Sequence, residues 1–99
     1  MDVILHNDDV IKGVEEARIF AEEALRGALH GKVERLTRVE VWVADENGPR
    51  AGPDDKRCAM EAHPRGRRPV GVRHHADDVK AAIKGAARKL ARALERELR

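Results

Sequence analysis

Three segments in the middle of the chain alternate apolar and polar residues, and this pattern constrains the fold more strongly than any other feature of the sequence. The segments read RLTRVEVWV at residues 35–43, KRCAMEAH at 56–63 and PVGVRHH at 69–75. Alternation with a period of two places successive side chains on opposite faces of a strand. We therefore expect three strands of one sheet, each buried on a single face. The expected buried residues are Val39, Val41, Val43, Cys58, Met60, Ala62, Val70 and Val72.

Segments with a helical period flank these strands. Apolar residues recur on one helical face between residues 10 and 29 and again between residues 79 and 94, where the second set includes Ile83, Leu90 and Leu94. A short apolar piece at residues 3–5 precedes the first helix. The predicted order is β-α-β-β-β-α. We expect an α+β domain in which both helices pack on one face of a four-stranded sheet.

The ends of the predicted elements carry the usual helix caps and turn residues. Asx residues favour helix starts, and glycine favours helix ends. The candidates are Asn7, Asp8 or Asp9 for the start of the first helix, Gly31 for its end, and Asp77 or Asp78 for the start of the second. The segment ADENGPRAGPDD at residues 44–55 is rich in turn residues and is expected to form a long loop.

Length and composition set the class of protein. The chain has 99 residues, of which 41% are hydrophobic and only 2% aromatic. We expect one domain over residues 1–99 whose core is aliphatic, and the aromatic content argues against base stacking as the main mode of binding. A single cysteine, no apolar run of the ~20 residues that span a bilayer, and no apolar leader favour the cytoplasm.

Catalytic and metal-binding motifs are absent from the sequence. It contains no serine and no tyrosine, which excludes nucleophiles and acids of those types. Cys58 and His63 are five residues apart on one strand and so point to opposite faces, as do the adjacent His74 and His75. We expect no catalytic residues, no cofactor and no metal site.

The final helix carries a basic stripe, which consists of Lys80, Lys84, Arg88, Arg92 and Arg96. These cations recur at every fourth position, whereas solvated helices usually alternate opposite charges at this spacing, because like pairs repel. Residues 77–99 hold seven Lys or Arg against four Asp or Glu, and residues 1–30 hold three against seven. The stripe is either a solvated face or a surface for a polyanion. We favour the polyanion, with Arg73 on the preceding strand as a further contact.

The order of elements and the final segment resemble the ribosome hibernation-promoting factor and ribosome-associated inhibitor family, in its short form. The similarity is clearest in RVEVWV, DKRCAMEA and ADDVKAAIKGAARKLARAL. It implies a non-catalytic cytoplasmic protein that binds the small ribosomal subunit and suppresses translation in stress or stationary phase. It also implies that the final helix contacts ribosomal RNA. The residues carried over are Lys80, Lys84, Arg88, Lys89 and Arg92.

Two features depart from that family. Its first helix is usually basic, whereas Glu15, Glu16, Glu22 and Glu23 make this one slightly acidic, and Lys80 replaces an aromatic residue. Two alternatives therefore stay open. One is a double-stranded RNA-binding module, and the other is a homodimeric protein–protein module that uses sheet edges or Ile19 and Phe20.

Overall fold

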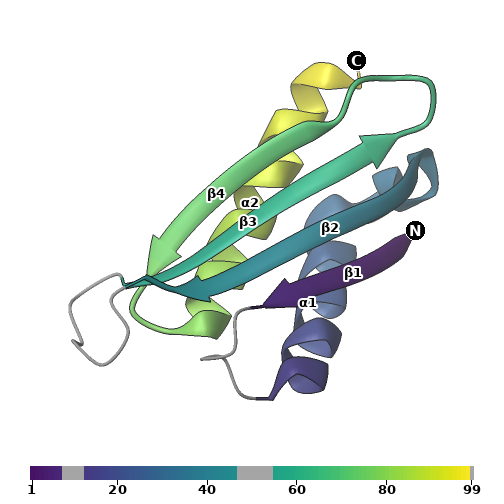
Figure 1. Cartoon of the computed structure of the whole chain (residues 1–99). Helices are drawn as coiled ribbons and strands as arrows, with labels where there is room; N and C mark the ends of the chain where they lie inside the picture. Colours follow the sequence, from purple (N-terminus) through teal and green to yellow (C-terminus); the bar gives the residue numbers. More distant parts are fainter. Residues whose placement is uncertain (8–12, 47–54, 99) are drawn as a thin grey trace.

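The computed structural model describes residues 1–7, 13–46 and 55–98 as one layer of strands and one layer of helices (Figure 1). The elements are β1 (Asp2–Asn7), α1 (Val14–Leu29), a short 3-10 helix η1 (His30–Arg35), β2 (Leu36–Asp45), β3 (Lys56–Pro64), β4 (Val70–Ala76) and α2 (Val79–Glu97). The predicted order β-α-β-β-β-α is confirmed, and within the described ranges η1 is the one addition to it.

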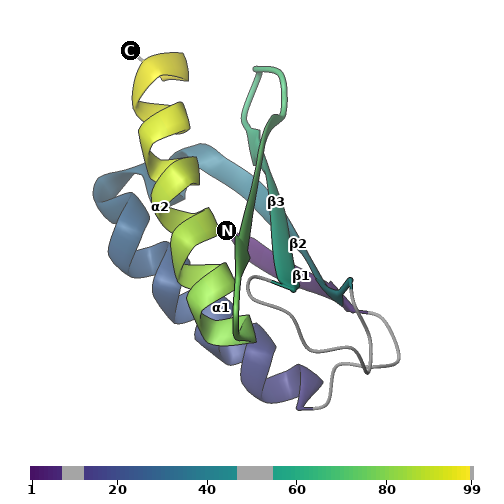
Figure 2. The same cartoon turned by 90° about the vertical axis from the view of Figure 1, so that its left-hand side faces the viewer.

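The four strands form a single mixed sheet in the order β1-β2-β3-β4. β1 pairs with β2 in parallel, and the other two pairs are antiparallel. α2 packs over β3 and β4, and α1 packs against β1 and α2. Figure 2 shows both helices on the same side of the sheet, as predicted. The opposite side, which we call the open face, carries no helix in the part of the chain that the structure describes.

The core lies between the sheet and the helices and is almost entirely aliphatic. The strands contribute Val39, Val41, Val43, Cys58, Met60 and Ala62, and α2 contributes Ile83, Leu90 and Leu94; all are buried. These predicted core positions are confirmed. Val70 and Val72 face the same way but are only half-buried. β4 is an edge strand, so its inward side chains have neighbours on one side only.

The start of α1 differs from the prediction. The helix begins at Val14, after Gly13 with φ 71°, and has no side-chain cap. Asn7 instead ends β1. Asp8, Asp9 and Val10 lie outside the described residues.

Two other predicted boundaries are corrected and one is confirmed. α1 ends at Leu29, where His30 takes a positive φ of 47°, so Gly31 lies inside η1 rather than ending the helix. β2 continues to Asp45, so the predicted loop begins later than expected, and residues 47–54 are not described. Asp78 caps α2 as predicted, because its Oδ1 accepts a hydrogen bond of 2.7 Å from the Ala81 N–H.

The helices in the described residues lack the combination of length and apolar composition that crossing a bilayer requires.

Candidate nucleic-acid interface

The basic stripe is fixed in place by the opposite face of α2. Ala82, Ile83, Ala86, Ala87, Leu90 and Leu94 are buried against the sheet and α1. At 3.6 residues per turn, the cations of the stripe must then face outward. Lys80, Lys84, Arg88, Arg92 and Arg96 are all exposed, and so is Lys89. Their exposure leaves these side chains accessible to a partner, and their contact with RNA stays a prediction.

The stripe is not neutralised by the part of the chain that the structure describes. No carboxylate there forms an ion pair with any of its five cations, whereas Arg18, Arg26 and Lys56 each pair with an acidic residue. Lys80 instead holds its ammonium 5.5 Å from the centroid of the Phe20 ring on α1. This cation–π contact gives Phe20 a role that helical periodicity did not reveal. All five exposed cations therefore lack a counterion among the described residues.

A shallow hollow between the helices borders the middle of the stripe. Lys84 and Arg88 line it together with Ala24, Gly27, Ala28 and Ala87, and its volume is about 270 Å³. The small side chains leave the floor of the hollow open. A phosphate that enters the hollow can therefore contact Lys84 and Arg88 without steric obstruction by α1.

Half of the acidic charge of α1 is compensated within that helix, because two of its four glutamates pair with arginines. Arg18 bonds to Glu15 at 2.6 Å and to Glu22 at 3.4 Å, and Arg26 bonds to Glu22 at 3.1 Å. The hydrogen bond from Arg18 lowers the pKa of the Glu15 carboxyl below its ordinary value. Glu16 and Glu23 lie beside Ile19 and Lys80 at the N-terminal end of the stripe. The repulsion that an acidic helix would exert on a polyanion is thus concentrated at that end.

Arg73 and Lys89 do not extend the stripe. Arg73 points to the open face, where it borders a hollow with Trp42, Ala59 and Gly71. Its carbonyl accepts a hydrogen bond of 2.9 Å from the Lys89 ammonium, so Lys89 reaches back to the edge of β4. The six predicted RNA-binding residues therefore divide into four on one surface, one at the sheet edge and one on the opposite face.

Arginines outside the predicted set hold the C-terminal end of α2. Arg67 Nη1 donates to the Glu97 carbonyl at 2.6 Å, and Arg35 Nη1 donates to the Leu98 carbonyl at 3.0 Å. These carbonyls have no partner within the helix, and cations there also offset the helix dipole. The arginine-rich turn after β3 is thus partly structural.

The predicted opposite orientations of Cys58 and His63, and of His74 and His75, are confirmed. Cys58 faces the core, and burial raises the pKa of its thiol to about 12, while His63 lies on the open face. His74 is half-buried and His75 is exposed, so the two imidazoles do not form a chelating pair. These thiol and imidazole groups give the chain no nucleophile of the cysteine–histidine type.

The family model of the sigma 54 modulation protein / S30EA ribosomal protein family matches residues 6–99. The chain belongs to this family. S30EA-family proteins are non-catalytic ribosome-associated factors, so the predicted family and the prediction that the chain is not an enzyme are confirmed. No curated protein sequence matches the chain significantly.

Two solved structures share the fold of this S30EA-family chain. A ribosomal subunit interface protein from Coxiella burnetii superposes with a TM-score of 0.74 at 11% identity, over 100% of both chains. The N-terminal domain of Protein Y from Thermus thermophilus superposes with a TM-score of 0.75 at 18% identity, over 98% of this chain and 99% of that one. At these identities the likeness establishes the fold.

Sequence reasoning missed one group of side chains in this S30EA-family chain. The side chains of Glu40 on β2 and of Glu61 and His63 on β3 meet on the open face. Glu40 and Glu61 are 21 residues apart in the sequence. The only local signal was the Glu-x-His spacing of Glu61 and His63, which places both side chains on one face of a strand. Glu40 could not be joined to them without the strand register.

Proposed function

We propose that the chain binds the small ribosomal subunit through phosphates of ribosomal RNA and thereby suppresses translation in stress or stationary phase. The observation that carries the proposal is the row of exposed cations on α2 that have no counterion among residues 1–7, 13–46 and 55–98. A row of unpaired like charges is unfavourable on a bare helix and becomes favourable when a polyanion neutralises it. Membership of a ribosome-associated family supports the ribosome as the source of that polyanion.

The proposed contacts differ in strength. Lys84 and Arg88 are central, because they border the open hollow between the helices. Arg92 continues the same surface, and Lys80 divides its charge between the partner and Phe20. Lys89 would contact RNA from the edge of β4. Arg73 would contribute only if RNA also reaches the open face.

Recognition by these groups would depend on shape and charge. Lysine and arginine contacts to phosphate position a protein without reading base edges, and the bases of A-form RNA are hidden in a deep, narrow groove. The described residues offer Trp42 and Phe20 as their aromatic rings, and Phe20 is already covered by Lys80. The proposal places the chain in the cytoplasm, where ribosomes translate.

Sedimentation of the chain with isolated ribosomal subunits tests this proposal. We expect co-migration with the small subunit at low salt and its loss in Lys84→Gln/Arg88→Gln. The matched control is Arg38→Gln/Arg57→Gln, which removes the same charge from the open face, where each arginine already pairs with a glutamate. Failure of the parent chain to co-migrate with either subunit would refute the proposal. Equal affinity for any double-stranded RNA would instead favour a general RNA-binding module.

A further inference from the structure

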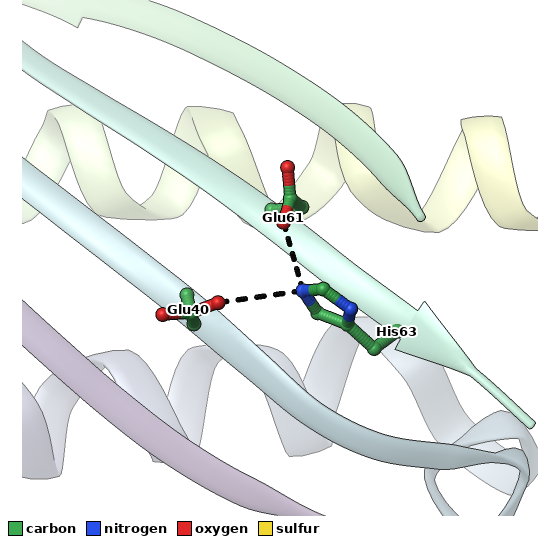
Figure 3. Close-up of side chains that lie close together, drawn as sticks. All are labelled: Glu40, Glu61 and His63. Atoms are coloured by element: carbon green, nitrogen blue, oxygen red, sulfur yellow. Dashed lines mark ion pairs between the residues drawn. The ribbon is translucent and has the colours of Figure 1, made fainter. Parts of the chain in front are cut away.

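A compact group of three side chains lies on the open face of the sheet, away from the basic stripe. Figure 3 shows Glu40 on β2 facing Glu61 and His63 on β3. His63 Nε2 lies 2.8 Å from Glu61 Oε1 and 3.4 Å from Glu40 Oε2. The three donor atoms all lie within 4.8 Å of one another. Among the described residues, this is the place where three side chains of the types His, Cys, Asp or Glu bring their donor atoms so close together.

The strand register brings two negative charges face to face. Glu40 and Glu61 are direct partners across β2 and β3. Like charges at directly opposed positions destabilise a sheet. The pairing is therefore unfavourable unless a positive charge lies between the two carboxylates.

A β-bulge at Thr37 fixes the position of the third group. Leu36 pairs with Pro64 and Arg38 pairs with His63, so Thr37 is the extra residue. Its hydroxyl donates a hydrogen bond of 3.0 Å to the His63 carbonyl. Bulges commonly redirect a side chain at a functional position. Here the bulge holds the backbone of His63 while its ring lies over the carboxylates.

The imidazole of His63 presents an unsatisfied nitrogen to this site. The His63 side chain is 16% exposed, and its Nε2 is covered from solvent. Although two carboxylate oxygens are near, neither lies in a direction that forms a hydrogen bond with Nε2. A covered polar atom without a partner is costly, and a ligand in the plane of the ring would remove that cost.

A second histidine, His6, contacts the other carboxylate oxygen of Glu40. His6 Nε2 lies 3.2 Å from Glu40 Oε1, and the His6 ring stacks on Trp42 at 5.1 Å between centroids. Groups that orient a ligating carboxylate from outside are a regular part of metal sites.

We propose that Glu40, Glu61 and His63 bind a divalent transition-metal ion of the Zn²⁺ class. One imidazole and two carboxylates suit Zn²⁺, while Mg²⁺ and Ca²⁺ prefer sites made only of oxygen ligands. Zn²⁺ bonds of 2.0–2.2 Å in tetrahedral geometry separate neighbouring donor atoms by roughly 3.3 Å, which the cluster approaches. The fourth position would hold water or a side chain of a partner.

Arg38 is the competitor of the ion for this site. Its Nε lies 3.4 Å from Glu40 Oε2, the same oxygen that faces His63. The Arg38 side chain is 44% exposed, so it can turn into solvent when an ion binds. Removal of this cation should tighten metal binding. A histidine that bound metal nonspecifically at the surface would not respond in this way.

Titration calorimetry of the full chain with ZnCl₂ tests the proposal, and the visible spectrum of Co²⁺ reports the geometry. We expect one ion per chain and a tetrahedral Co²⁺ spectrum. His63→Gln and Glu61→Gln should each weaken binding at least ~10-fold, since even outer groups of metal sites change affinity by that much. Arg38→Gln should bind more tightly than the parent chain.

His75→Gln is the matched control. His75 also lies beside one glutamate, with Nε2 2.5 Å from Glu46 Oε1, but no third ligand joins this pair in the described residues. Its affinity should equal that of the parent chain. Absence of stoichiometric Zn²⁺ binding, or binding that survives both His63→Gln and Glu61→Gln, overturns the proposal. Circular dichroism of each variant separates loss of the site from loss of the fold.

Discussion

The imidazole of His74 occupies the space in which a side chain at Gly85 would begin. A Cβ at Gly85 would overlap the His74 ring, so β4 and α2 approach closely only because residue 85 is glycine. Glycine is normally unfavourable inside a helix. At position 85, glycine lowers the helix propensity but allows β4 to pack closely against α2, the helix that carries the basic stripe.

Gly85→Ala should therefore destabilise the protein, although alanine favours a helix by about 1 kcal/mol. Overpacking of this kind costs ~1–3 kcal/mol. Urea denaturation measures the change in the free energy of unfolding. His74→Ala/Gly85→Ala should lose less stability than the sum of the single variants, because the overlap is absent. An additive double variant would mean that the two residues do not clash.

Ile83→Ala should lower the free energy of unfolding by ~2–5 kcal/mol, because this side chain of α2 is fully buried. Ile19→Ala is the control, since Ile19 is 45% exposed and surface changes usually stay within ~0.5 kcal/mol. Thermal or urea denaturation measures both. Similar losses for the two variants would contradict the assigned inward face of α2.

The salt dependence of ribosome binding should show how many phosphate contacts the basic stripe makes. Each contact releases counterions, so the slope of log affinity against log salt should shrink by about 0.7–0.9 for each cation removed. Lys84→Gln/Arg88→Gln should bind more weakly and with a flatter slope. An unchanged affinity and slope would show that the stripe is a solvated face.

Arg73→Gln should weaken subunit binding less than Lys84→Gln does, because Arg73 lies on the open face. The comparison uses the same subunit-binding assay at one salt concentration. Equal losses would indicate that RNA wraps around the edge of β4 and reaches both faces of the sheet.

Cys58 should resist alkylation in the folded protein. Its thiol is buried, and its pKa of about 12 keeps it protonated at neutral pH. The thiolate is the reactive form, so the rate with iodoacetamide should be low in buffer and rise sharply in urea. Fast labelling of the native chain, measured by mass spectrometry, would contradict the buried position on β3.

Sequence reasoning recovered the elements and the inward faces of the strands because each follows from a local period. Val39, Val41 and Val43 could be assigned to the core without any long-range information. The helix start at Gly13 was missed because no side chain caps it, and Asn7 was a better candidate by residue type alone. Similarly, His30 adopts the positive φ that glycine usually supplies.

The candidate sites were predictable only where one element contains them. The stripe lies on a single helix, so its spacing revealed it. Arg73 was grouped with it by proximity in sequence, but strand alternation sends its side chain to the other face. The Glu40, Glu61 and His63 cluster depends on the β2–β3 register and on the bulge at Thr37. Neither can be read from a pattern within one strand.

The helix that carries the stripe is secured at both ends. Asp78 bonds the first turn, and Arg35 and Arg67 bond the last carbonyls from two separate parts of the chain. Ends held in this way do not fray readily, so the cations between them keep fixed relative positions before any partner arrives. Binding to a partner then requires little further ordering of the backbone. A smaller loss of conformational entropy therefore opposes the favourable electrostatic interaction.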